Sequence, residues 1–366
     1  MSKVRVAVLF GGRSSEHSIS CISAAAVWRT LEAAGYDVEP IALTPTAGMV
    51  RFDGTHEDLR AESLPVVDSG SAEVVIPCDP SIGGIVVDGA VRTIDVVFPV
   101  LHGPWGEDGT IQGLLELAGL PYVGSGVLAS SLCMDKITFK TILRGNGMKV
   151  ADWVGIDTAT WQHSRAEVMT AIRELGSVVF VKPSRAGSSM GISRVETATE
   201  GDSLFESALE RAIDEARAHD PRVIVEAAVI GAREIECGVR QRSDGPIEAS
   251  VCAEIVVKSG FAFYDFDAKY LADGAELVVP ANLSDDVAGQ VRSLARRCFT
   301  DAGCEGLARV DFFVTADEIV VNELNTMPGF TPISMFPRMW QESGVSYEDL
   351  IVDLVEQARG RGTGLR

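Results

Sequence analysis

Short, continuous apolar runs that end in glycine-rich polar segments are the feature that most constrains how this 366-residue chain folds. Residues 4–10 lead into Gly11-Gly12, residues 94–101 lead into HGPWGEDGT, and residues 178–181 lead into KPSRAGSSMG. Runs without polar alternation are typical of strands that are buried on both faces of a parallel sheet. The polar segments then lie at the ends of strands, where open α/β sheets place their ligands.

Further elements divide the chain into three blocks. A helix at residues 18–34 and a strand at residues 38–43 follow the first run, which predicts a parallel sheet. After residue 221, several strands surround a helix at residues 285–302. A length of roughly 150 residues per domain allows two or three domains. We therefore expect α/β and α+β architecture that begins with a Rossmann-like parallel-sheet domain, with domains at residues 1–125, 126–225 and 226–366.

The charge balance and the cysteine pattern exclude several classes of protein. The chain has 32 basic and 52 acidic residues, a net charge of −20, which argues against nucleic acid or an anionic membrane as a partner. The seven cysteines form no CxxC pair and the five histidines show no zinc-site spacing, so reduced thiols in a cytoplasmic protein are expected. No apolar run reaches the roughly 18 residues of a membrane helix, and glycine interrupts the first run too early for a signal peptide, so no membrane insertion is expected.

A pair of neighbouring strands near the C-terminus carries a cluster of oxygen ligands. Asp311 lies in LARVDFFVT, and Glu323 and Asn325 lie in EIVVNELNT, with a turn near residues 316–317. Residues two apart in a strand share one face, and a hairpin brings Asp311 beside the other two. Two carboxylates about 4 Å apart repel by roughly 4 kcal/mol at an effective dielectric of 20, so a cation is needed. Oxygen-only ligands suit Mg²⁺; the alternative is a solvated strand edge followed by an ordinary turn.

Three other segments have the composition of ligand-binding loops. Lys182 ends a buried strand, which is costly unless its charge meets an anion, and the small residues after it expose N–H groups that can cover phosphates. The alternative is a flexible hairpin whose lysine reaches solvent. Residues 11–16 and 102–110 follow strands of the same kind, so they form either a shared site or two glycine turns. Residues 264–270 form either a covering loop or an ordinary surface loop.

Two better-known motifs lack their usual context, and the Walker A motif is absent. Residues 124–129 fit a dinucleotide fingerprint, but the strand before them is only three residues long. Residues 187–191 fit the G-x-S-x-G elbow of serine hydrolases, with Ser189 as the nucleophile, but Ile-Ser-Arg-Val after Gly191 predicts a strand instead of the required helix. A serine hydrolase nevertheless stays as an alternative from another class.

Taken in order, these segments resemble the ATP-grasp ligases, specifically the D-alanine–D-alanine ligase family. The matching stretches run from residue 10 to residue 334: FGGRSSEHSIS, LHGPWGEDGTIQG, MDKITFK, VKPSRAGSSMGIS, VEAAVIGAREIE, YDFDAKY, GLARVDFF and VNELNTMPGFTPIS. The resemblance implies a three-domain ATP-grasp architecture with ATP between the central and C-terminal domains. It also implies ATP-dependent ligation of two D-alanines through D-alanyl phosphate, for peptidoglycan precursor synthesis.

The resemblance implies roles for individual residues on the nucleotide side. Asp311, Glu323 and Asn325 would hold two Mg²⁺ or Mn²⁺ ions, with K⁺ as an additional candidate cofactor. Lys136, Lys182 and Lys269 would contact the phosphates of ATP, and Ser188 with the backbone around Gly187 would form the phosphate flap. The remaining ATP-binding residues would be Glu226 and Val229 at the adenine, Glu234 at the ribose, and Asn322.

On the amino-acid side, the resemblance assigns the ammonium group of the first D-alanine to Glu16 and places His102 near its carboxylate. Arg309 and the Gly329 N–H would stabilise the oxyanion. Ser334 and the Met335 backbone would bind the carboxylate of the second D-alanine, and Tyr270 would join Glu16 and Ser188 in a network. The Lys269-Tyr270 pair favours an amine acceptor, with D-lactate or D-serine as the alternative. A homodimer is also implied.

Overall fold

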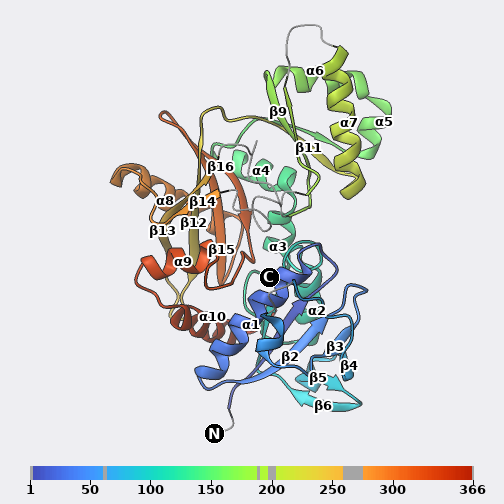
Figure 1. Ribbon diagram of the computed structural model, residues 1–366, viewed down its shortest axis with the longest axis vertical. Coiled ribbons are helices and arrows are strands. Elements are labelled where there is room, and N and C mark those ends of the chain that lie inside the picture. Colours follow the sequence, from blue (N-terminus) through green and yellow to red (C-terminus); the bar gives the residue numbers. More distant parts are fainter. Residues whose placement is uncertain (1–2, 61–63, 188–189, 197–202, 259–274, 365–366) are drawn as a thin grey trace.

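The computed structural model describes residues 3–60, 64–187, 190–196, 203–258 and 275–364. Three sheets follow one another along the chain, and Figure 1 shows them at the bottom, the upper right and the left of the molecule. No helix within these ranges is long and apolar enough to cross a membrane. All seven cysteines lie within the same ranges and carry free thiols, as predicted.

The first sheet has seven strands in the order β6-β5-β4-β3-β2-β1-β7. β1 pairs in parallel with β2 and with β7, as predicted, but the pairs from β2 to β6 are antiparallel. The expected parallel sheet is therefore a mixed one. The links from β2 to β3, from β4 to β5 and from β5 to β6 are too short for the crossover that parallel strands need, whereas the longer link from β3 to β4 also returns antiparallel. The strands are β1 (Arg5–Gly11), β2 (Asp37–Leu43), β3 (Met49–Arg51), β4 (Ala72–Val75), β5 (Gly84–Val87), β6 (Ala90–Thr93) and β7 (Val96–Val100).

Alternate residues of β1 enter two different hydrophobic clusters. Val8 and Phe10 pack with α1 (His17–Ala33) and α10 (Tyr347–Arg361), while Leu9 packs with α2 (Thr110–Ala118) on the other face. Figure 1 shows α10, in red, beside α1, in blue. Each large apolar side chain buried in this way contributes about 1.5–3 kcal/mol. The C-terminal helix is thus part of the core of the N-terminal sheet.

The second sheet has four strands in the order β10-β9-β11-β8. β10 pairs antiparallel with β9, so the strand predicted after Gly191 is confirmed. The sequence boundary at residue 225 falls inside β11, so the passage to the next sheet comes after this strand. The elements are β8 (Trp153–Ile156), α5 (Thr158–His163), α6 (Arg165–Glu174), β9 (Val178–Pro183), β10 (Ser193–Glu196), α7 (Ser203–His219) and β11 (Val223–Ala227).

The third sheet has five strands in the order β14-β13-β12-β15-β16, all antiparallel. Cys252 and Ala253 are neighbours on β13 and point to opposite faces, the first into a cluster with α8 and the second into a cluster with α9. α3 and α4 also contribute to the α8 face, through residues such as Cys133 and Phe139. The elements are α3 (Val127–Met134), α4 (Lys136–Gly145), β12 (Arg233–Gln241), β13 (Ile247–Val257), β14 (Ala275–Val278), α8 (Asp285–Asp301), β15 (Leu307–Val314), β16 (Ile319–Asn325) and α9 (Met335–Glu342); short 3₁₀ turns occupy His56–Leu59 and Pro80–Ile82.

Candidate active site

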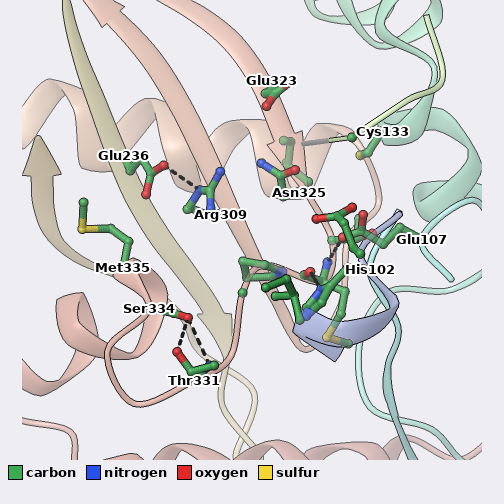
Figure 2. Close-up of a pocket in the computed structure, with 18 of the residues that line it drawn as sticks. His102, Glu107, Cys133, Glu236, Arg309, Glu323, Asn325, Thr331, Ser334 and Met335 are labelled. Carbon is green, nitrogen blue, oxygen red and sulfur yellow. Dashed lines mark hydrogen bonds and ion pairs between the residues drawn. The ribbon is translucent and has the colours of Figure 1, made fainter. Parts of the chain in front are cut away.

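Two adjoining cavities contain most of the residues that the sequence singled out. The first, of about 410 Å³, is lined by loops of the N-terminal sheet and by the third sheet. The second, of about 460 Å³, lies between the second and third sheets. Residues that line both include Lys136, Glu236, Arg309 and Glu323. Charged side chains therefore lie where the two cavities adjoin. Figure 2 shows three of them, Glu236, Arg309 and Glu323, among the residues that line the first cavity.

The hairpin of β15 and β16 supplies the predicted oxygen ligands. Asp311 is paired with Glu323, and Arg309 with Asn325, across a turn between Val314 and Ile319. The predicted hairpin and its register are confirmed. The Asn325 Nδ2 donates a hydrogen bond of 3.2 Å to an Asp311 carboxylate oxygen. Two carboxylates and one amide make up this set, and within the described ranges no cluster of three or more His, Cys, Asp or Glu residues is arranged for a metal.

Two cations stand beside these carboxylates. Arg309 donates two hydrogen bonds of 2.7 Å to Asp311, and its Nε lies 3.3 Å from Glu236. Burial works against the charged guanidinium, but Asp311 and Glu236 outweigh it and raise the pKa of Arg309. Lys136, at the start of α4, lies 3.4 Å from Glu323 and donates to the Ala186 carbonyl at 2.9 Å. The negative charges of Asp311 and Glu323 are thus balanced by Arg309 and Lys136, respectively.

A buried group of three charges lies beside the second cavity. The Glu226 carboxylate is 2.8 Å from Lys140 Nζ and 2.6 Å from Lys182 Nζ, so the anion that Lys182 required is a carboxylate of the protein. Burial opposes ionisation of Glu226, yet the two ammonium groups hold its pKa at about 2. Burial lowers the pKa of Lys140, which is 1% exposed, in spite of Glu226. Lys140 was not among the predicted site residues, although it lies four residues after Lys136 and so on the same helix face.

The N-terminal side of the first cavity carries Glu16 and His102. His102 Nδ1 donates to the Met327 carbonyl at 3.0 Å, and its Nε2 lies 3.3 Å from the Ser23 Oγ. Burial lowers the pKa of His102, in spite of the opposing effect of the nearby Glu16 and of the Met327 carbonyl. Gly187 is close to Glu16, since a Cβ on Gly187 would lie 3.1 Å from a carboxylate oxygen of Glu16. Ser14 Oγ donates to the His102 carbonyl at 2.7 Å, so the loops at residues 11–16 and 102–110 lie together, as a shared site requires.

Ser334 and Met335 lie at the N-terminus of α9, a helix that the sequence analysis did not predict. Ser334 is the N-cap residue but its side chain does not cap the helix; its Oγ instead accepts a hydrogen bond of 3.1 Å from the Thr331 N–H. A Cβ on Gly329 would lie 3.2 Å from the same Oγ. The first N–H groups of a helix have no partner within it and carry partial positive charge, so this end suits a carboxylate.

The acidic residue Glu107, which was not among the predicted site residues, also lines the first cavity. Its carboxylate accepts hydrogen bonds from the Gly103 N–H at 2.9 Å and the Met327 N–H at 3.2 Å. Burial, and then the charge of Glu16, raise the pKa of Glu107 to about 8, against the opposing effect of these donors and of Arg309. The only feature of the sequence that pointed to Glu107 is that an acidic residue follows Gly106 in a loop at the end of a strand.

Five described residues assigned to ATP line the second cavity together with Lys136: Lys182, Glu226, Val229, Glu234 and Asn322. Gly187 lines the first cavity instead. Ser188, Ser189, Lys269 and Tyr270 lie outside the described residues. Gly191 is followed by the strand β10, not by a helix, so the elbow that a serine hydrolase needs is missing and that alternative is not supported.

Comparison with known proteins gives one family for the whole chain. The family model described as D-ala D-ala ligase N-terminus matches residues 5–125, and the model described as D-ala D-ala ligase C-terminus matches residues 142–356. The D-alanine–D-alanine ligase of Nocardia farcinica is 52% identical over 376 residues, covering 100% of this chain and 99% of that protein. The ligase of the same name from Mycobacterium sp. strain KMS is 51% identical over 380 residues, covering 100% and 98%.

Solved structures agree with this assignment. The VanG D-Ala:D-Ser ligase of Enterococcus faecalis matches with a TM-score of 0.84 and 33% identity, over 98% of this chain and 100% of that one. The D-alanine–D-alanine ligase of Coxiella burnetii matches with a TM-score of 0.81 and 34% identity, over 99% and 95%. The chain therefore belongs to the D-alanine–D-alanine ligase family and is an enzyme with the ATP-grasp fold.

Proposed function

We propose that this enzyme joins two molecules of D-alanine to D-alanyl-D-alanine, with conversion of ATP to ADP and phosphate. The main support is that Lys136, Arg309 and Glu323 line both cavities. A nucleotide in the second cavity and an amino acid in the first would meet at these charged side chains, as phosphoryl transfer requires. The product would serve peptidoglycan precursor synthesis, and the enzyme would work in the cytoplasm as a homodimer.

The first step activates a carboxylate, which by itself is a poor electrophile. A carboxylate oxygen of the first D-alanine attacks the γ-phosphorus of ATP, the bond to ADP breaks, and D-alanyl phosphate forms. Glu16 would hold the ammonium group of this D-alanine and His102 would lie near its carboxylate. Lys136 and Lys182 would neutralise phosphate charge.

The second step forms the peptide bond. The amine of the second D-alanine, once it has lost a proton, attacks the acyl carbon and phosphate leaves. Arg309 and the Gly329 N–H would stabilise the tetrahedral oxyanion, and one such donor is typically worth about 3 kcal/mol. Ser334 and the Met335 N–H, at the N-terminus of α9, would hold the carboxylate of the second D-alanine.

Asp311, Glu323 and Asn325 fit a magnesium site, because all three offer oxygen ligands and two of them are paired across one hairpin. Two Mg²⁺ or Mn²⁺ ions held there would act as Lewis acids on phosphate oxygens. Arg309 and Lys136 lie against the same carboxylates, at 2.7 Å from Asp311 and 3.4 Å from Glu323.

Residues outside the described ranges complete the proposal through the family resemblance. Lys269 would be the third lysine on the phosphates, and Ser188 with Gly187 would cover them. Tyr270 would link Glu16 and Ser188. Enclosure is needed because water would hydrolyse the acyl phosphate.

The experiment that tests the function measures phosphate release from ATP with Mg²⁺ and D-alanine, with or without D-serine or D-lactate, and identifies the products by mass. We expect D-alanyl-D-alanine, with one phosphate per dipeptide. The second candidate is a D-serine or D-lactate ligase, favoured by the likeness to the VanG D-Ala:D-Ser ligase. A mixed dipeptide or an ester as the main product would establish that candidate, and no phosphate release in any mixture would contradict both.

A further inference from the structure

The peptide units on both sides of Met327 are bonded by one loop of the N-terminal sheet. His102 Nδ1 donates to the Met327 carbonyl at 3.0 Å, and Glu107 accepts from the Met327 N–H at 3.2 Å. Both residues belong to the loop between β7 and α2, about 220 residues earlier in the chain. Figure 2 shows His102 and Glu107 side by side. These two hydrogen bonds, hereafter the Met327 contacts, join two distant segments at one residue.

Met327 lies midway between two residues with proposed roles in the reaction. Asn325 is two residues before it and Gly329 is two residues after it. Pro328 fixes its own φ and restricts Met327 to extended backbone, so the segment has few ways to bend. Met327 is itself 5% exposed. A shift of the Met327 peptide would therefore be passed to both Asn325 and Gly329.

Glu107 holds its own loop as well. Its second carboxylate oxygen accepts from the Gly103 N–H at 2.9 Å, next to His102. A carboxylate has two oxygens, so one side chain satisfies donors from both segments at once. The charged groups that act on Glu107 are Glu16 and Arg309, and both line the first cavity with it.

We propose that Glu107 is a positioning residue, which sets the place of Asn325 and Gly329 relative to the loop of His102 through the Met327 contacts. The expected effect on kcat rests on the proposed function, because it is measured as dipeptide formation. The side chain need not touch substrate for this role. Errors of about 1 Å in such positioning cost about a hundredfold in rate.

The test uses the full chain at pH 9, above the pKa of about 8 of Glu107, with Glu107→Gln, which keeps the length of the side chain but offers one acceptor oxygen where the ionised carboxylate offers two. The matched control is Asp108→Asn. Asp108 accepts from the N–H groups of Trp105 in the same loop, at 2.8 Å, and of Thr110 at the start of α2, at 3.0 Å, so its loss leaves the Met327 contacts intact. Three quantities are measured for each variant: kcat for dipeptide formation, the Kd for ADP, and amide hydrogen exchange of residues 322–330.

For Glu107→Gln we expect kcat to fall about tenfold to a hundredfold and exchange around Met327 to become faster. The Kd for ADP should change by less than about twofold, because the nucleotide residues line the second cavity. Asp108→Asn should change each quantity by less than about twofold.

Unchanged kcat and unchanged exchange in Glu107→Gln would overturn the proposal. A loss of ADP affinity in proportion to kcat would also overturn it, because Glu107 would then support the whole fold. If the unmodified enzyme makes no dipeptide, the proposed function fails, but hydrogen exchange needs no turnover and still decides the role of Glu107.

Discussion

Arg309 and Asp311, two residues apart on β15, are joined by two hydrogen bonds of 2.7 Å each. The carboxylate proposed as a metal ligand is thus held by the guanidinium proposed to stabilise the oxyanion. Bidentate pairs of this kind fix direction as well as distance. Binding of a metal to Asp311 would compete with Arg309 for the same oxygens and would free its N–H groups for substrate.

The partner of Asp311 across the hairpin gives the first prediction. Glu323→Gln should reduce turnover at least about a hundredfold, because the site loses a charge but no volume. The melting temperature should stay close to that of the unmodified enzyme. Asp317→Asn, in the exposed turn of the same hairpin, is the control and should keep full activity. Turnover like that of the unmodified enzyme in Glu323→Gln would contradict the metal assignment.

The buried pair of Lys140 and Glu226 predicts a large effect on stability. Lys140→Met removes one of the two ammonium groups on Glu226 and should lower the free energy of unfolding by about 3 kcal/mol. Lys149, which pairs with Glu318 at a side-chain exposure of 60%, is the matched control. Lys149→Met should cost less than about 0.5 kcal/mol by denaturant unfolding. If Lys140→Met and Lys149→Met lost the same free energy of unfolding, burial of the Lys140–Glu226 pair would not be the cause of its effect on stability.

The low pKa of Glu226 predicts a loss of stability in acid. Burial opposes its ionisation, but Lys140 and Lys182 lower the pKa from 4.5 to about 2. The folded state therefore binds this proton less readily than the unfolded chain does. The stabilisation is present above pH 4.5 and is lost as the pH falls toward 2, by about 3 kcal/mol in total.

The measurement compares the melting temperatures of the unmodified enzyme and Glu226→Gln across this pH range. The unmodified enzyme should be the more stable near pH 6, and the difference should shrink as the pH falls below 4.5. A difference that stays constant with pH would mean that Glu226 does not titrate in this window.

Ser334 predicts an effect on substrate binding without a large effect on the fold. Its Oγ does not cap α9 but bonds Thr331 within the preceding loop, so Ser334→Ala should lower the free energy of unfolding by no more than about 1 kcal/mol. The KM for the second D-alanine should rise about tenfold, as expected for loss of one hydrogen bond to a charged group. Ser346 is the control for a serine that caps a helix but lies outside the proposed site: its Oγ accepts a hydrogen bond from the Asp349 N–H at the start of α10. Ser346→Ala should cost about 1 kcal/mol of stability and leave KM unchanged.

Local sequence patterns were sufficient to predict the hairpin that pairs Asp311 with Glu323. The two strands are separated by a short turn, and the period of two fixes which side chains share a face. The strand after Gly191 and the parallel pairing of β1 with β2 were predicted for the same kind of reason. The helix α9 was not, because Pro337 stands in its first turn and only its packing against β13 marks it as a helix.

The sequence by itself determined the strand ends, the hairpin with its oxygen ligands and the family, because each depends on residues close together or on the order of short motifs. Tertiary structure alone decided that Lys140 and Lys182 share Glu226, that α10 packs on the N-terminal sheet, and that Glu107 reaches Met327. These contacts join segments far apart in the chain: 44 residues separate Lys182 from Glu226, and 220 separate Glu107 from Met327. Chain order does not specify such pairs; they form because each buried charge and each apolar face needs a partner once the three sheets pack together.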